Sequence, residues 1–173
     1  MIRENLDNIP QYELPADCAL QWYTKGYEKI WLAIHKATDK YHDFTDDFFA
    51  NQFGPDENLL HQRQCYLFDK DNIPFATATA WFDNDYNGNE YGRVHWVAIT
   101  PSMQGKGLAN PLLTIICNRL HQLGHKRVYL GTSTIRIPAI NLYLKFGFKP
   151  HIRNEEDQKI WQQLQKLSGI KIT

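Results

Sequence analysis

A glycine loop, a tyrosine and a histidine are the features of this sequence best suited to chemistry. The loop Gln104-Gly105-Lys106-Gly107-Leu108-Ala109 follows an apolar run with strand character, Val97-Ala98-Ile99, and precedes a long apolar-periodic segment. A strand, a glycine loop and a helix N-terminus in this order point several backbone N–H groups at one spot, where the helix dipole adds partial positive charge. The junction therefore predicts a site for a phosphate or pyrophosphate. A phenol can donate a proton and an imidazole can accept one, so Tyr143, before Phe146-Gly147-Phe148, and His95, on the strand before the loop, are residue types suited to acid and base chemistry.

The elements that must position these residues follow from the spacing of apolar side chains. Three- and four-residue spacing predicts helices over 27–39, 108–123, 137–146 and 154–168, and a short helix capped by Thr45 that ends near Gly54. Alternation predicts strands over 64–68, 75–82, 93–99 and 127–131, an extended segment over 148–152, and short strands at 19–22 and 169–172. Residues 1–18 are predicted to form an irregular N-terminal arm before one domain over 19–173. The order of elements predicts an α+β fold, a mixed sheet with helices on its faces.

Composition narrows the classes of function. The 173 residues are 43% hydrophobic and 22% charged, which fits one packed domain. A formal net charge of +0 gives no general basic field for nucleic acid or for an anionic membrane surface. The cysteines Cys18, Cys65 and Cys117 form no CxxC pair, so neither a disulfide framework nor a zinc site is expected, and a reduced cytoplasmic setting fits best. We expect no signal peptide and no membrane-spanning segment.

Two familiar phosphate loops do not fit the glycine loop. The P-loop pattern needs an upstream glycine and a Ser or Thr after the lysine, and Gly105-Lys106-Gly107 has neither. The dinucleotide fingerprint needs a third glycine and an acidic residue about 20 positions further on, where this chain has Asn110 and Arg127.

The loop instead resembles the acyl-CoA loop of the GNAT N-acetyltransferases, Gln/Arg-x-x-Gly-x-Gly/Ala, at every defined position. A second segment, Ala139 to Phe148, is similar to the other signature of that family, a short helix with Asn141 and Tyr143 that runs into Gly147-Phe148. The resemblance implies the acyl-CoA N-acyltransferase fold, with a central, mostly antiparallel sheet flanked by helices. It also implies acetyl-CoA as cosubstrate, no metal, and transfer of an acetyl group to a primary amine by direct attack in a ternary complex.

The resemblance assigns donor-binding roles to named residues. The N–H groups from Gln104 to Ala109 would bind the pyrophosphate, with added charge from Lys106. The pantetheine arm would pair with the main chain of Val97, Ala98 and Ile99, and an N–H near Val97 would polarise the thioester carbonyl. Asn141 matches a position that hydrogen-bonds the pantetheine. The alternatives are a plain buried strand and a solvated helix residue.

The resemblance also gives the candidate acid and base their roles. Tyr143 would protonate the leaving thiolate, the alternative being a core tyrosine with a bonded hydroxyl. His95, two residues before Val97 and expected on the same strand face, would take the amine proton directly or through water, the alternative being a half-buried structural histidine. Glu90, Asp83 or ordered water are the other candidates for the base.

The acceptor is expected to be a small-molecule amine. The lining expected from the first two helices, their connection and the late strands is aromatic and acidic: Tyr41, His42, Asp43, Phe44, Asp46, Asp47, Phe48 and Trp81. A protein N-terminus or lysine, a larger acyl chain, or a non-catalytic acyl-CoA-binding module remain as alternatives, as does a monomer or a homodimer. His121 and His125, four apart, are expected to form a solvated helix end and not a metal site. The helix over 154–168 departs from the hairpin that usually ends the family's sheet.

Overall fold

The computed structural model describes residues 1–168, which fold around a six-stranded sheet. Its strands are β1 (Ile2–Arg3), β2 (Ala19–Trp22), β3 (Gln64–Phe68), β4 (Pro74–Tyr86), β5 (Asn89–Ile99) and β6 (Val128–Tyr129), in the spatial order β1-β6-β5-β4-β3-β2. The helices are α1 (Tyr27–Thr38), α2 (Phe48–Phe53), α3 (Glu57–Arg63), α4 (Ala109–Gln122), α5 (Ile137–Lys145) and α6 (Glu155–Ser168). Neighbouring strands are antiparallel except for β5 and β6, so the predicted mixed α+β sheet is confirmed.

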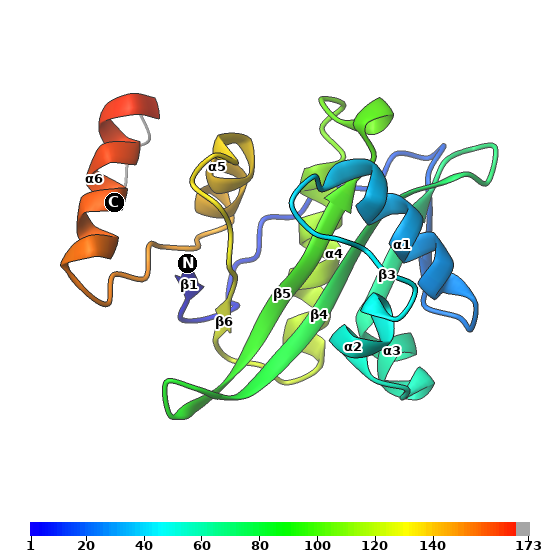
Figure 1. The fold of residues 1–173 in the computed structure, drawn as a ribbon, viewed down its shortest axis with the longest axis horizontal. Helices are drawn as coiled ribbons and strands as arrows, with labels where there is room; N and C mark the ends of the chain where they lie inside the picture. The colour runs from blue at the N-terminus through cyan, green and yellow to red at the C-terminus, as the bar shows by residue number, and fades with distance from the viewer. Residues whose placement is uncertain (169–173) are drawn as a thin grey trace.

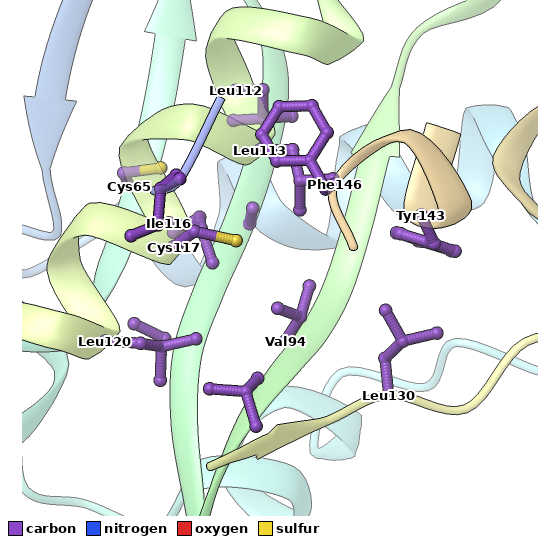
Figure 2. Packing of buried hydrophobic residues seen from close by; sticks show 14 of the residues in the cluster. Cys65, Val94, Leu112, Leu113, Ile116, Cys117, Leu120, Leu130, Tyr143 and Phe146 are labelled. Atoms are coloured by element: carbon purple, nitrogen blue, oxygen red, sulfur yellow. The ribbon is translucent and has the colours of Figure 1, made fainter. Parts of the chain in front are cut away.

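Helices cover the sheet on both faces (Figure 1). On one face α4 buries an apolar stripe that includes Leu112, Ile116 and Leu120 against the alanines of β4. Figure 2 shows this cluster reaching across β5 to Tyr143 and Leu130 on the far side of the strand. On the opposite face α1 and α2 pack an aromatic cluster around Trp31, which is fully buried. Burial of this much apolar surface on both faces is the main stabilising contribution to the fold.

The start of the chain is part of the sheet, so the prediction of an irregular arm over 1–18 was wrong in part. Ile2 and Arg3 pair with Tyr129 and Val128, and Ile2 exchanges two backbone hydrogen bonds with Lys149 at 2.8 and 2.7 Å. β1 therefore lies between β6 and the segment that follows α5. Ile2, Leu6 and Ile9 are too sparse in a polar stretch to give a periodic signal.

Other predictions differ from the structure in detail. α3 was not predicted, although Asp56 caps it by accepting from the Leu59 N–H at 2.9 Å. Asp47 and not Thr45 stands at the N-terminus of α2, and the Thr45 hydroxyl donates to the Asp47 carboxylate. The segment 148–152 forms one isolated bridge and no strand, and the strand expected at 169–172 lies outside the described residues.

The predicted C-terminal helix is confirmed as α6, and it packs on α5. Leu164 is buried with Ile140, and Ile160 and Trp161 contribute to the same small cluster. In Figure 1 α6 lies beyond α5, on the side away from β5. Among the described helices, none combines the length and apolar character that a membrane span requires.

The parallel strands β5 and β6 separate soon after they meet. They pair only through Gly92 with Val128 and Arg93 with Tyr129, whereas β5 continues to Ile99. Within the described chain, the edge of β5 from Val94 to Ile99 therefore has no strand beside it on the side of β6. The separation of β5 from the connection between β6 and α5 is visible in Figure 1.

Candidate functional site

A bulge interrupts β5 where it has left β6. Thr79 pairs with His95 and Thr77 with Ala98, so Trp96 and Val97 lie opposite the single residue Ala78. Such an extra residue is left out of the hydrogen-bonded ladder and re-aims the neighbouring side chains.

Trp96 carries the backbone strain of this bulge. Its φ of 48° lies in the left-handed region, which costs a bulky residue about 1–2 kcal/mol. The indole N–H donates to the Gln52 side-chain oxygen at 3.0 Å, and the ring lies 5.2 Å from that of Trp31. These contacts hold the conformation in place. Strained backbone persists only where the surrounding structure holds it, and it occurs most often at functional sites.

The glycine loop adopts the conformation that its residues require. Gly105 and Gly107 have φ of 75° and 78°, and α4 begins directly after the loop at Ala109. In the described chain, no backbone carbonyl accepts the N–H groups of residues 105–108. The Gln104 side chain donates to the Ile99 carbonyl at 2.8 Å and so fastens the loop to the end of β5. The loop thus presents free N–H donors and the exposed Lys106 to solvent, as an anion site requires.

Tyr143 lies on α5 at the boundary between the core and the separation of β5 from β6. It is 8% exposed, and its hydroxyl makes no hydrogen bond to a described residue. Burial raises the pKa of Tyr143 to about 12, against the opposing effect of the Arg136 guanidinium. The phenol is therefore protonated at neutral pH and free to donate. Asn141, on the same helix, is exposed.

His95 and Val97 do not share a strand face, so that expectation was wrong. His95 contacts Phe53 of α2 at 5.9 Å between ring centroids, whereas Val97 packs against the cluster under α4. The bulge between them breaks the alternation on which the expectation depended. Burial, with the nearby Arg93 charge, lowers the pKa of His95 to about 3, so the ring is neutral but a weak base.

A charged network joins the α1–α2 connection to the start of α5, next to the bulge at Trp96. Asp39 accepts from the His42 ring at 3.0 Å and from the Arg136 guanidinium at 3.1 Å. Its side chain is only 7% exposed, and it also accepts from the N–H of Tyr41 at 2.8 Å. Burial alone would raise the pKa of Asp39, but these hydrogen bonds lower it below its ordinary value. Asp39 is therefore held ionised between α1 and the start of α5.

Sequence reasoning missed Asp39, Arg136 and Trp96 as site residues. The contact between Asp39 and Arg136 joins positions 97 residues apart, and only the folded sheet brings them together. Trp96 could not be predicted from its neighbours, because a tryptophan rarely adopts a positive φ and nothing in the adjacent sequence indicates a bulge. A weak signal was present at Asp39, where an acidic residue follows a helix and stands three positions before His42.

The predicted acceptor lining is divided between core and surface. Phe44 is buried, Phe48 and Trp81 are partly buried, and Tyr41 is 72% exposed. The remaining members are exposed: His42, Asp43, Asp46 and Asp47. Two of the aromatic members contact Trp96, with 6.1 Å between the ring centroids of Phe44 and Trp96 and 5.6 Å between those of Phe48 and Trp96. The expected lining thus has two parts, a packed aromatic part and an exposed acidic part. We call the packed part, Phe44 and Phe48 together with Trp96, the aromatic or acceptor floor.

The alternative bases lie away from this floor. Glu90 lies 3.5 Å from His125, and Asp83 accepts from the Tyr129 hydroxyl at 3.0 Å, both beyond the bulge toward the β4–β5 turn. His125 is buried whereas His121 is exposed on the last turn of α4. No group of three potential metal ligands occurs among the residues that the structure describes.

The separated parallel strands, the glycine loop with free N–H donors and the buried tyrosine together define the class, an acyl-CoA-binding transferase fold. A family model described as the Acetyltransferase (GNAT) family matches residues 19–148. The chain belongs to this family.

Curated relatives and solved structures agree with this assignment. The chain is 27% identical over 148 residues to a mycothiol acetyltransferase of Arthrobacter sp. (strain FB24), covering 81% of this chain and 45% of the relative. The chain thus spans about half of that relative's length or less. It is similar to a GCN5-related N-acetyltransferase from Sphaerobacter thermophilus (TM-score 0.65, 20% identity, 84% of this chain and 46% of that one). It also resembles the ribosomal-protein-S18-alanine N-acetyltransferase from Escherichia coli (TM-score 0.63, 18% identity, 78% and 79%). At these identities the structures establish the shared fold.

Proposed function

We propose that this protein is an acetyl-CoA-dependent N-acetyltransferase that transfers an acetyl group to the primary amine of a small molecule. The observation that carries the proposal is the free edge of β5 beside the glycine loop. The β5 edge from Val94 to Ile99 has no strand beside it on the side of β6, and the N–H groups of residues 105–108 donate to no backbone carbonyl in the described chain.

The residues present fit an acyl-CoA thioester. The N–H groups of residues 105–108, together with Lys106, match the charge of a pyrophosphate. The free edge of β5 at Val97, Ala98 and Ile99 matches an arm with amide groups, which would add to the sheet as a further strand. Asn141 is exposed on α5 and available to hydrogen-bond the same arm. Backbone groups at the bulge near Val97 are suited to polarise the carbonyl of the thioester.

Acetyl-CoA supplies the activated acetyl group as a thioester. The residues of this chain would then bind the donor along β5 and the amine over the aromatic floor at Trp96. One proton must leave the amine nitrogen, and another must reach the leaving sulfur. Tyr143 is suited to donate its phenol proton to the leaving sulfur. His95 was the predicted base, and its place on the acceptor face supports contact with the amine. Its low pKa makes it a weak base, so we propose that His95 lines the acceptor site and does not accept the proton.

A protein acceptor is the second candidate, favoured by the likeness to the ribosomal-protein alanine N-acetyltransferase. The small-molecule proposal is preferred because Asp39 and Arg136 join the α1–α2 connection to the start of α5. We propose that this contact limits the room for an extended peptide across the aromatic floor.

Two measurements test the proposal. Calorimetry should show binding of acetyl-CoA in the micromolar range, and the absence of binding at millimolar acetyl-CoA would refute it. A thiol-release assay should then show turnover with members of a panel of alkylamines, polyamines, amino acids and aminoglycosides, and less with peptides bearing a free N-terminus or a lysine. Turnover with peptides alone would support the protein acceptor, and binding without turnover would support a non-catalytic module.

A further inference from the structure

The connection between α1 and α2 holds an aspartate and a histidine arranged for proton transfer. The Asp39 carboxylate, held by Arg136 and by two backbone N–H groups, fixes the His42 ring through a 3.0 Å hydrogen bond at Nδ1. A carboxylate at Nδ1 fixes the tautomer and stabilises the imidazolium that forms when the other nitrogen accepts a proton. In the described chain Nε2 of His42 makes no hydrogen bond, and 48% of the side chain is exposed.

His42 lies on the acceptor side of the bulge, where the amine is proposed to approach. Its ring centroid is 5.3 Å from that of Trp96, the residue of the bulge, and 6.2 Å from that of Phe48 on the acceptor floor. The Arg136 that holds Asp39 also acts electrostatically on Tyr143. The network thus connects the candidate acid on α5 with the acceptor face of β5. Three charged or titratable groups face His42. They are His35 in α1, Asp39 at the end of α1, and Arg136 at the start of α5.

The other histidines near Trp96 are less suited to accept a proton. His35 is 3% exposed, and burial lowers its pKa to about 3. His95 is covered by Phe53 and carries a similarly lowered pKa. Neither ring has a carboxylate partner among the described hydrogen bonds and ion pairs, whereas His42 has one.

We infer that His42, oriented by Asp39, is the general base that takes the proton of the attacking amine. The inference rests on the proposed function and deepens it. As the amine nitrogen bonds to the acetyl carbon, Nε2 of His42 accepts one N–H proton. As the carbon–sulfur bond breaks, the sulfur receives the phenol proton of Tyr143. His42 then loses its proton to solvent and Tyr143 regains one, so that the products are the N-acetyl amine and the free thiol. Asp39 acts through His42 and is a positioning residue.

The test compares His42→Gln with two other histidine variants on one alkylamine substrate. We expect His42→Gln to lower kcat by about 10²-fold, the usual contribution of a general base, with unchanged affinity for acetyl-CoA. His121→Gln, an exposed histidine on α4 far from the site, is the matched control and should keep full activity. His95→Gln should lose less kcat than His42→Gln.

Three readouts separate catalysis from structure. Added imidazole should restore turnover to a His42→Ala variant. An arylamine, whose nitrogen loses its proton to water more readily once it has bonded to the acetyl carbon, should depend less on His42 than an alkylamine does. Asp39→Asn should lower kcat more than it raises KM, and should shift the acid limb of the kcat profile against pH. Larger losses in His95→Gln than in His42→Gln, with no rescue by imidazole, would overturn the inference and leave the acetyltransferase intact. Failure of every amine in the wild-type protein would instead overturn the proposed function.

Discussion

The two sides of the β5 strand are built from different parts of the chain. The side toward β6, where the donor is proposed to bind, consists of consecutive main-chain groups from the strand, the glycine loop and the start of α4. The side toward α1 and α2, where the acceptor is proposed to bind, consists of side chains from α1, α2, β5 and the start of α5. The donor side is thus a local structure, and the acceptor side is assembled by the fold.

This difference explains how one side can be general and the other selective. Main-chain groups recognise a diphosphate and an amide-bearing arm whatever the neighbouring side chains are. The acceptor floor depends on contacts such as those of Trp96 with Trp31 and Gln52, and on the ion pair of Asp39 with Arg136. Changes on the acceptor side should alter turnover or stability, while changes on the donor side should alter affinity for acetyl-CoA.

The largest effect, and the clearest exception to this comparison, is expected at Tyr143, the proposed acid, which belongs to the donor side. Tyr143→Phe should lower kcat by about 10²-fold because the leaving sulfur loses its proton donor, while acetyl-CoA affinity stays unchanged. Tyr91→Phe is the matched control, since both tyrosines are 8% exposed and only Tyr143 lies at the site. Steady-state kinetics with calorimetry decides, and an equal loss of activity in both variants would point to stability and not to catalysis.

A second break is expected at Gly92, where β5 and β6 meet before they separate. A Cβ at this position would lie 2.9 Å from Leu120 Cδ2 and 3.0 Å from His125 Cγ, so Gly92→Ala must displace these two side chains or β5 itself. Overpacking of this kind costs about 1–3 kcal/mol of unfolding free energy. Gly131→Ala, where a Cβ meets nothing within 4 Å, is the control. Urea unfolding measures the stability of both variants, and equal stabilities would show that the neighbouring side chains accommodate the added methyl group without cost.

The donor side could be predicted from the sequence because its signals are local. The loop, the helix after it and the short helix with Tyr143 each follow from a few neighbouring residues, and their elements were found within one or two positions. The cofactor roles of Gln104 to Ala109 and of Asn141 remain predictions that rest on family resemblance and on free main-chain groups.

The acceptor side could not be predicted in the same way. His42 was placed in the lining, but its partner Asp39 and the Arg136 that holds them are joined by contacts that sequence spacing does not encode. The bulge at Trp96 reversed the expected face of His95, because alternation assumes a regular strand. At the sheet edge, β1 occupies a place that no local pattern assigns to it.

A third prediction sharpens the donor side. Gly107 has φ of 78°, so Gly107→Ala should disfavour the loop conformation and weaken acetyl-CoA binding by about 10-fold, which corresponds to about 1.4 kcal/mol. Gly88→Ala in the β4–β5 turn is the matched control, because Gly88 has φ of 75° and an added Cβ would meet nothing within 4 Å. Calorimetry should show weaker binding only for Gly107→Ala. Equal affinities would separate the loop from the binding site.

The smallest effect is expected from pH, and on the acceptor side it can be tested at His35. Burial lowers the pKa of His35 in the native protein to about 3, from about 6.5 in the unfolded chain. Between these two pH values His35 is protonated in the unfolded chain and neutral in the native protein. The unfolding free energy should therefore be independent of His35 above about pH 7, and should fall by about 1 kcal/mol from this residue between about pH 6.5 and 5.5. His35→Gln should remove that part of the slope, whereas the exposed His121→Gln should keep it. Urea unfolding across this range provides the measurement. An unchanged slope in His35→Gln would mean that other histidines with a lowered pKa, such as His95, carry the acid sensitivity of the native protein.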